Sequence, residues 1–240
     1  MIERGTLEKL YVHDGLSIYK IGEILGVSPI TVWYWLRKHN VPIRHRRGRQ
    51  PTPIKLKLNR DLAYLLGLLL GNGYINKYKY SISLSTHSDT LARQAFSAFK
   101  SVGLNARIYH PNTTTIQVVA YSKVFAEWYL SLSHSDIENI IGGRNELVAA
   151  FLKGFYESNG VIWIDRGYTR ISFIGVDRGI LEFIYRQILK YPIKAHFYGP
   201  IKPSKTMFTR KPYYKIIING RHAERFLEIT KPCIKNYIFS

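Results

Sequence analysis

The sequence predicts an α+β protein in which a small all-α domain is followed by an αββαββα unit that occurs twice. Three observations lead to this fold class. Residues 7–36 carry apolar side chains at helical spacing in three short segments. From Leu62 onward, patterns typical of helices and strands follow one another in a fixed order, and that order then repeats. Each copy opens with a helix that ends on Asn-Gly, in LLGLLLGNGYI (65–75) and FLKGFYESNGVI (151–162).

The charge of the chain predicts a polyanionic partner. The 240 residues carry a formal net charge of +19, and the sequence pI is about 9.9. Residues 1–60 hold 12 Lys or Arg and 4 Asp or Glu, whereas residues 61–240 hold 23 and 12, so both portions are basic. With no run of 18 apolar residues and no signal-peptide core, we expect an intracellular protein of the cytoplasm or nucleoid, without a membrane partner. Nucleic acid is then the favoured polyanion.

The single cysteine limits the covalent and metal chemistry of the chain. Cys233 has no second cysteine with which to form an intrachain disulfide, and a cysteine-based zinc module is excluded. We expect Cys233 to be a small buried apolar residue near the C-terminus.

Residues 1–43 predict three helices. Leu7, Leu10 and Tyr11 share a face of the first helix, and Asp14-Gly15 ends it. Ser17 is the expected N-cap of the second helix, which runs to Leu25 and is followed by Gly26 at a position that favours positive φ. Ser28-Pro29 then forms the start of a third helix, because serine caps well and proline is tolerated at the first helical position.

The segment IGEILGVSPITVWYWLR resembles the helix-turn-helix family, with Gly22, Gly26-Val27 and Val32 at packing positions of that family. The resemblance implies that the third helix lies in the major groove. The residues expected to face DNA are Thr31, Tyr34, Arg37 and Lys38, with Ser28 available to a phosphate. The alternative is a plain helical hairpin that caps the main domain. Trp33 and Trp35 fall on different faces, and we expect at least one of them to pack against the core.

A basic segment separates this domain from the rest. Residues 44–60 are the predicted linker, and RHRRGRQPTP within it is too rich in cations and helix breakers for a regular element. Its arginines resemble the short arms that enter the minor groove of A·T-rich DNA. A solvated linker that touches phosphates without sequence preference explains the same composition. Both alternatives remain open for Arg44, Arg46, Arg47 and Arg49.

The two copies are predicted to span residues 61–135 and 136–240. In the first copy, strands are expected at 74–78, 80–85, 106–109 and 115–120, with helices after residue 86 and from residue 123. In the second copy, strands are expected at 161–165, 169–175, 194–198 and 213–218, with helices from residues 177 and 221.

Two glycines inside the opening helices predict how the copies meet. Gly67 and Gly154 each cost ~1 kcal/mol relative to alanine in a helix, so a compensating contact is expected. Close packing of the two helices around a pseudo-twofold axis would provide it. Their ends, Asn72 and Asn159, would then lie close together between two sheets.

The segments LLGLLLGNG (65–73) and LKGFYESNG (152–160), each leading into ββαββα, resemble the two-motif LAGLIDADG homing endonucleases. The resemblance implies a monomer with pseudo-twofold symmetry whose two four-stranded sheets form a saddle over double-stranded DNA. It also implies that one acid before each final glycine binds Mg²⁺ or another divalent cation, and that both DNA strands are cut.

The sequence departs from the family at those two acids. Asn72 and Asn159 occupy the positions, and an amide supplies no negative charge to a hard cation. Glu157 lies about 200° around the helix from Asn159 and Asp165 lies in the next strand, so neither is expected to substitute. Either Asn-Gly taken alone is also a common turn dipeptide. Taken as a pair, the asparagines predict a cleavage-deficient chain, whether by natural loss or by deliberate change.

Other site residues follow from the same resemblance. Lys123 matches a basic residue that the family often carries near the phosphate, and Arg221 is its counterpart in the second copy, although both are equally well explained as surface cations. Alternation along the strands predicts contacts with the major groove at Ser81, Ser83, Ser85, Thr115, Gln117, Arg170, Ser172, Tyr213 and Lys215.

The sequence therefore predicts a sequence-specific binder of duplex DNA on a homing-endonuclease scaffold. The alternative is a DNA-binding transcriptional regulator built on the same scaffold. RNA is a weaker candidate partner.

Overall fold

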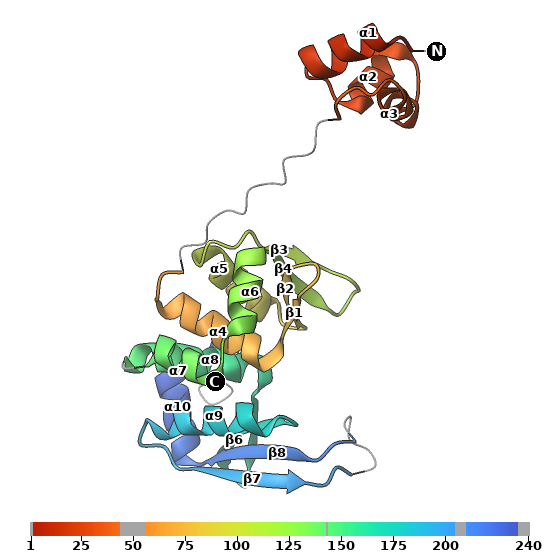
Figure 1. The fold of residues 1–240 in the computed structure, drawn as a ribbon. Coiled ribbons are helices and arrows are strands. Elements are labelled where there is room, and N and C mark those ends of the chain that lie inside the picture. The colour runs from red at the N-terminus through yellow and green to blue at the C-terminus, as the bar shows by residue number, and fades with distance from the viewer. Residues whose placement is uncertain (1, 44–55, 143, 205–209, 235–240) are drawn as a thin grey trace. The chain divides into compact units, whose positions relative to one another are not determined.

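The computed structural model describes residues 2–43, 56–142, 144–204 and 210–234. The chain divides into two compact units, residues 1–50 and 51–240 (Figure 1). The predicted contacts Arg44, Arg46, Arg47 and Arg49 lie outside the described residues. Among the residues that are described, no helix has both the length and the apolarity that crossing a bilayer requires.

The N-terminal unit is built from short helices. They are α1 (Arg4–Leu7), which continues into a π-helical turn, η1 (Glu8–His13), then α2 (Ile18–Leu25) and α3 (Pro29–Lys38). The predicted caps are present, since the Ser17 hydroxyl accepts a hydrogen bond from the Lys20 amide and the Ser28 hydroxyl accepts one from the Thr31 amide. Gly26 adopts φ 64°, in the left-handed region expected for it.

A small apolar core holds these helices together. Its buried members are Leu7, Tyr11, Ile21, Val32, Leu36 and Val41. Trp35 packs against this core while Trp33 is exposed, as their different faces predicted. A Cβ on Gly22 would lie 2.7 Å from the Val27 carbonyl oxygen. Glycine is therefore needed at this position because the turn before α3 crosses α2 closely.

The C-terminal unit contains the predicted duplication. The first copy is α4 (Arg60–Asn72), β1 (Gly73–Asn76), β2 (Ser81–Thr86), α5 (Asp89–Ser101), β3 (Arg107–Tyr109), β4 (Ile116–Tyr121) and α6 (Lys123–Ser131). The second copy is α8 (Asn145–Asn159), β5 (Val161–Asp165), β6 (Tyr168–Gly175), α9 (Arg178–Leu189), β7 (Ala195–Ile201), β8 (Tyr213–Asn219) and α10 (Arg221–Thr230). The strand bounds differ from the expected ones by three residues at most. The helix α7 (His134–Ile141) was not predicted from the sequence; it begins with a capping box formed by Ser133 and Asp136.

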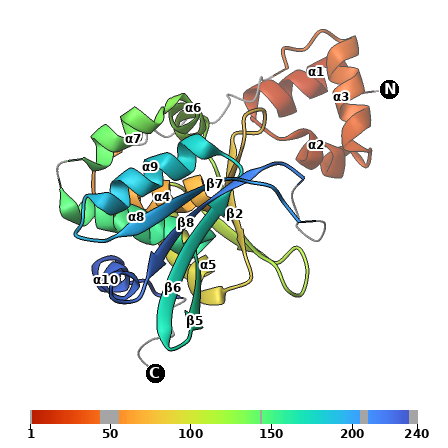
Figure 2. The same ribbon diagram turned by 90° about the horizontal axis from the view of Figure 1, so that it is seen from below.

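Each copy forms one antiparallel four-stranded sheet. The strand orders are β1-β2-β4-β3 and β5-β6-β8-β7, so the two sheets have matching topology. Apolar residues in register across each sheet turn towards the helices, as with Leu84 beside Val118 and Phe173 beside Ile216. In Figure 2 the strands of the second sheet run side by side with α9 lying against them.

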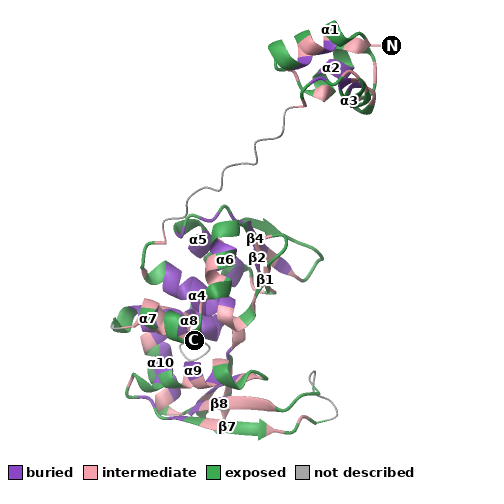
Figure 3. Ribbon diagram, in the orientation of Figure 1, coloured by how far each residue is buried: buried purple, intermediate pink, exposed green. Residues whose placement is uncertain are grey.

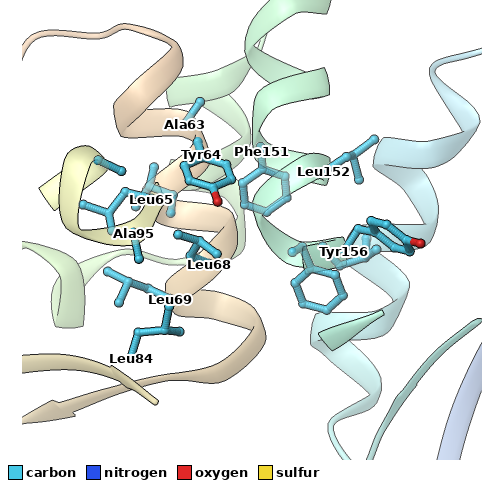
Figure 4. Packing of buried hydrophobic residues seen from close by; sticks show 14 of the residues in the cluster. Ala63, Tyr64, Leu65, Leu68, Leu69, Leu84, Ala95, Phe151, Leu152 and Tyr156 are labelled. Atoms are coloured by element: carbon cyan, nitrogen blue, oxygen red, sulfur yellow. The ribbon is translucent and has the colours of Figure 1, made fainter. Parts of the chain in front are cut away.

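The two opening helices lie in the middle of the unit with one sheet on either side (Figure 1). A Cβ on Gly67 would lie 2.0 Å from the Phe151 carbonyl oxygen, and a Cβ on Gly154 would lie 2.1 Å from the Tyr64 carbonyl oxygen. The reciprocal contact confirms that α4 and α8 pack through their glycines. Figure 4 shows the side chains that surround this crossing, and Figure 3 shows that buried residues dominate both helices.

The end of the described chain packs beside α8. The Cys233 amide donates a hydrogen bond of 2.5 Å to the Glu157 carboxylate, and Lys153 Nζ lies 3.1 Å from the Cys233 sulfur. The Cys233 side chain is exposed, so the expectation of a buried cysteine is wrong. The reason is that its backbone, held by Glu157, forms the contact with the unit and leaves the thiol at the surface.

Candidate nucleic-acid interface

The ends of α4 and α8 meet, as the sequence predicted. A Cβ added to Gly71 would lie 2.0 Å from the Ser158 hydroxyl and 3.3 Å from the Cβ of Asn159. Gly71 therefore allows the two helix ends to approach each other closely. Asn72 and Asn159 are the last residues of their helices, and the glycine that follows each of them continues directly into a strand.

The Asn-Gly pairs are not positive-φ turns. Gly73 has φ −82° and Gly160 has φ −70°, both in extended backbone. Glycine is required for a different reason, because a Cβ on Gly73 would lie 2.5 Å from the Leu69 Cα and one on Gly160 would lie 2.3 Å from the Tyr156 ring. The pairs thus mark tight helix-to-strand junctions at the centre of the unit.

Both asparagine amides are turned towards backbone carbonyls. Asn72 Nδ2 donates to the Ser85 carbonyl at 3.3 Å, and Asn159 Nδ2 donates to the Gly71 carbonyl at 3.5 Å. Asn72 is exposed, whereas the Asn159 Oδ1 atom is buried and has no hydrogen-bond partner within the described part of the chain. The two sites are therefore asymmetric despite the duplication.

These residues do not fit a divalent cation. Mg²⁺ is a hard cation that is held by anionic oxygen ligands, and the two amides place N–H groups where such ligands are needed. Among the residues that the structure describes, no group of three His, Cys, Asp or Glu side chains is suited to hold a metal ion. The donor set therefore disagrees with the metal chemistry that the sequence resemblance implies.

Neither nearby acid repairs this disagreement. Glu157 is buried, and its carboxylate accepts hydrogen bonds from the Tyr64 hydroxyl and the Cys233 amide, both at 2.5 Å. Burial, together with the negative charge of Glu157, raises the pKa of the Tyr64 hydroxyl well above its usual range. Asp165 forms an ion pair with Arg170 at 2.8 Å. Glu157 and Asp165 are thus engaged in structural contacts, in agreement with their expected positions.

The two predicted cations occupy equivalent places in the two copies. Lys123 is the first residue of α6 and Arg221 is the first residue of α10, each directly after the last strand of its copy. Lys123 Nζ lies 3.7 Å from the Glu127 carboxylate and 5.5 Å from the centre of the Tyr80 ring. Both side chains are at the surface.

A cavity of about 530 Å³ lies beside the end of α4. Asn72 contributes to its wall together with Ser85, His87 and Ser158. The His87 ring is fixed there by a 2.8 Å hydrogen bond between Nδ1 and the Thr114 carbonyl. Leu84, Leu91 and Ile234 add apolar surface to the wall, and among the described residues Glu157 is the one acid that lines it. The Glu157 carboxylate is held by the Tyr64 hydroxyl and the Cys233 amide, so it does not replace the missing acid at Asn72.

The face of the first sheet that points away from the helices holds the residues predicted by alternation. Ser81, Ser85 and Gln117 lie on this face, and Ser85 is in register with Gln117. Thr115 lies just before β4 at the same alternation. Further residues of this face were not predicted from the sequence, and they are Tyr74, Asn76, Arg107, Tyr109 and Tyr121. Their membership depends on strand register, which the pattern within one strand does not show.

The second sheet has a corresponding open face. Arg170, Tyr213 and Lys215 lie on it, and Lys215 Nζ is 5.4 Å from the centre of the Trp163 ring. Four residues of the same face were not predicted from the sequence, namely Trp163, His196, Tyr198 and Asn219.

Two of the residues predicted to contact DNA lie on the expected sheet faces but are almost completely buried. Ser83 is 6% exposed and Ser172 is 2% exposed, so their proposed role as direct contacts needs correction. Larger residues stand beside each of them in register, Tyr74 for Ser83 and Val161 for Ser172. The Ser83 hydroxyl also donates to the Tyr74 carbonyl at 3.4 Å. Alternation predicted the direction of both side chains and could not predict how their neighbours cover them.

The strands and their connections carry almost no negative charge. Outside the helices, residues 73–88, 102–122, 161–176 and 191–220 contain one acid, Asp165, which is paired with Arg170. The same segments contain eleven cations: Lys77, Lys79, Arg107, Arg166, Arg170, Lys194, Lys202, Lys205, Arg210, Lys211 and Lys215. A basic surface interleaved with tyrosine and tryptophan suits a phosphate backbone and base edges.

The N-terminal unit places its predicted contacts around α3. The Ser28 hydroxyl caps the helix and is also 2.8 Å from the Thr31 hydroxyl. Arg37 lies over the Trp33 ring at 5.0 Å, and Lys38 Nζ lies 5.7 Å from the Tyr34 ring centre. Tyr34, Arg37 and Lys38 are exposed, and Thr31 is half-buried.

The fold and the paired helix ends define a duplicated α+β scaffold of two four-stranded sheets with an added helical unit. The chain belongs to the family of LAGLIDADG-like domains, whose sequence profile matches residues 59–144 and again residues 146–231. It is 27% identical over 178 residues to an uncharacterised protein of Methanocaldococcus jannaschii, and the match covers 68% of each chain.

Solved structures of other proteins share the fold, and two of them illustrate it. The homing endonuclease I-DmoI, in complex with DNA and Mn, superposes with a TM-score of 0.53 at 19% identity, covering 72% of this chain and 97% of that one. The N-terminal LAGLIDADG domain of WhiA gives a TM-score of 0.53 at 16% identity, covering 75% of this chain and 86% of that one. At these identities the likeness establishes the α+β fold of paired four-stranded sheets.

Proposed function

We propose that this protein binds duplex DNA sequence-specifically through the open faces of its two sheets and cleaves it poorly or not at all. The observation that supports binding is the near absence of carboxylates from these strands and loops, combined with eleven cations and several exposed aromatic side chains. Phosphates attract such a surface, and side chains on the strands are then placed to read base edges.

The expected loss of cleavage rests on the helix ends. Asn72 and Asn159 point N–H groups at carbonyls, so the residues present do not form a site for Mg²⁺. A divalent cation bound by carboxylates would supply charge neutralisation at phosphate and an activated water. In this chain the side chains at the helix ends can orient and contact DNA but provide no general base or anionic ligand. Lys123 and Arg221 are proposed to contact phosphates.

The test starts with selection of bound sequences from a random duplex library, followed by incubation of the selected site with Mg²⁺ or Mn²⁺. We expect salt-dependent binding of the selected site and no efficient double-strand break. Binding that shows no preference over unrelated duplexes would remove the proposed specificity. Efficient, site-specific cutting of both strands by the unaltered chain would remove the claim that the asparagines are disabling.

A paired substitution tests the role of the helix ends directly. The double variant Asn72→Asp, Asn159→Asp adds two carboxylates at the site, while Asn105→Asp, Asn139→Asp makes the same charge change at exposed positions elsewhere. Cleavage by the first variant but not by the second supports an inactivated nuclease. If both double variants fold and bind DNA but do not cleave it, the result favours the second candidate function, a DNA-binding regulator. The additional helical unit supports this candidate.

RNA is the remaining candidate partner. Structured RNA and duplex DNA are to be compared as competitors for the labelled duplex. If RNA displaces the labelled duplex from the protein at a lower concentration than unlabelled duplex DNA does, the proposed preference for DNA over RNA is reversed.

A further inference from the structure

The first turn of α3 presents an apolar side chain to the surroundings. Ile30, the second residue of the helix, is 78% exposed, more than any other large apolar residue described in the N-terminal unit. A single exposed isoleucine is not unusual by itself. Its position is informative because Tyr34, which is also exposed, follows one turn later on the same side of the helix, and Arg37 follows at the next turn.

The polar groups of this first turn are already engaged. The Ser28 hydroxyl accepts a hydrogen bond from the Thr31 backbone amide. The hydroxyl oxygens of Ser28 and Thr31 are 2.8 Å apart, within hydrogen-bond distance of each other. Two of the residues expected to contact DNA are therefore occupied with capping the helix. Ile30 remains as the outward side chain in the first turn of α3.

The distribution of charge in the helical unit also singles out the outward face of α3. Residues 2–43 contain five Lys or Arg and four Asp or Glu, and two of the acids form ion pairs, Glu8 with Arg4 at 2.8 Å and Glu23 with Lys20 at 2.7 Å. The helix α3 contains no acid, and its two cations, Arg37 and Lys38, lie in the last turn. The outward face of α3 is thus apolar and aromatic at its start and cationic at its end.

We propose that Ile30 is a specificity-determining residue that packs against the 5-methyl group of thymine in the major groove. In helix-turn-helix proteins, residues near the start of the second helix of the motif contact base edges. An isoleucine cannot form a hydrogen bond there, and the thymine methyl is the apolar group that the major groove offers. The inference rests on the proposed duplex binding and extends it, since it adds α3 to the binding surface of the two sheets and specifies what this helix recognises.

The size of the effect follows from the burial of one methyl group. Burying a CH₂-sized group contributes ~0.8 kcal/mol, which corresponds to about a fourfold change in affinity. Replacing the contacted thymine by uracil removes this methyl and keeps the base pair. We therefore expect uracil at that position to weaken binding by about fourfold.

The experiment uses the full chain and the duplex obtained by selection. Each thymine is replaced singly by uracil, and the dissociation constant is measured for the unaltered protein, for Ile30→Ala and for Ile24→Ala. Ile24 is the matched control because it is another exposed isoleucine of the same unit, on α2. We expect one or two positions at which uracil weakens binding by the unaltered protein and by Ile24→Ala. At the same positions, uracil should leave the dissociation constant of Ile30→Ala unchanged.

The possible outcomes separate the inference from the proposed function. Failure to bind any duplex overturns both. Specific binding in which no uracil substitution matters, or in which Ile30→Ala keeps the full uracil effect, overturns the inference and leaves duplex binding in place. Self-association of the chain that is abolished by Ile30→Ala, with unchanged DNA affinity, also overturns it and assigns this face to protein contact.

Discussion

The close crossing of α4 and α8 gives a prediction that can be worked out from the structure. At an ordinary helical position, replacing glycine by alanine stabilises a helix by ~1 kcal/mol. At Gly154 the added Cβ would lie 2.1 Å from the Tyr64 carbonyl oxygen and 2.9 Å from the Leu68 amide nitrogen. Both atoms belong to backbone in the middle of a buried helix, so a rotamer change does not relieve the contact.

The helices must separate by more than about 1 Å to restore an ordinary contact distance, and a gap of this size removes a quarter to a half of the local dispersion energy. Overpacking of this kind costs about 1–3 kcal/mol, and more where backbone must move. Because backbone must move here, we take a cost of about 3–4 kcal/mol, above the usual range. Subtracting the ~1 kcal/mol gain in helix propensity, we expect Gly154→Ala to lower the free energy of unfolding by about 2–3 kcal/mol. For a unit of this size that corresponds to a fall in Tm of roughly 4–12 °C.

Thermal unfolding of the full chain, followed by circular dichroism, measures this effect. The matched control is Gly179→Ala in α9 of the same unit, where the nearest atoms are side-chain atoms, at 3.3 Å or beyond, and the expected change lies between no effect and a gain of ~1 kcal/mol. A Gly154→Ala protein as stable as the unaltered chain, or more stable, would refute the argument that the glycines are required by backbone contact.

Three further predictions concern pH, the open sheet face and the N-terminal unit. Burial raises the pKa of the Tyr64, Tyr129 and Tyr191 hydroxyls, that of Tyr191 to about 12, so stability is retained below the unfolded-state value of ~10 and is lost as pH rises above it. The loss is up to ~1.4 kcal/mol per pH unit for each of the deeply buried Tyr64 and Tyr129 hydroxyls, and solvent screening makes it smaller for the half-buried Tyr191. Denaturant titrations between pH 9 and 11 check this, and Tyr64→Phe should reduce the slope by up to about half. Arg107→Ala, on the exposed edge strand β3, should weaken binding to all duplexes and reduce the slope of log Kd against log salt by about 0.9, whereas a change confined to one DNA sequence would contradict a phosphate contact. Ser28→Ala removes the cap of α3 and should cost ~1 kcal/mol, seen as faster hydrogen exchange at the Thr31 amide; unchanged exchange would show that the cap contributes nothing.

Much of the fold was accessible from local patterns. Apolar spacing and the caps at Ser17 and Ser28 predicted the helices of the N-terminal unit, because these interactions act within a few residues of sequence. The repeated order of elements predicted the two sheets, and Gly67 with Gly154 predicted the helix crossing. The helix α7 was missed, since its apolar stripe is short and lies between two stronger helical patterns.

The candidate site was less completely predicted. Alternation placed Ser83 and Ser172 on the open faces, but burial by residues in neighbouring strands depends on register between segments far apart in sequence. Arg107 and Trp163 were missed for the same reason. Ile30 was missed because an apolar residue at a helix start is unremarkable in sequence, and its exposure appears only when the fold shows which side of α3 faces the core.

The sequence by itself determined that this protein has a duplicated unit, a basic strand surface and asparagine where the family resemblance implies an acid. These are properties of residue identity and spacing. The tertiary structure decided how the asparagines are used, because the Asn159 amide reaches the Gly71 carbonyl, a group 88 residues earlier in the chain. It also decided that Glu157 is committed to Tyr64 and the Cys233 amide. Such contacts join segments that only packing brings together, so no local pattern contains them.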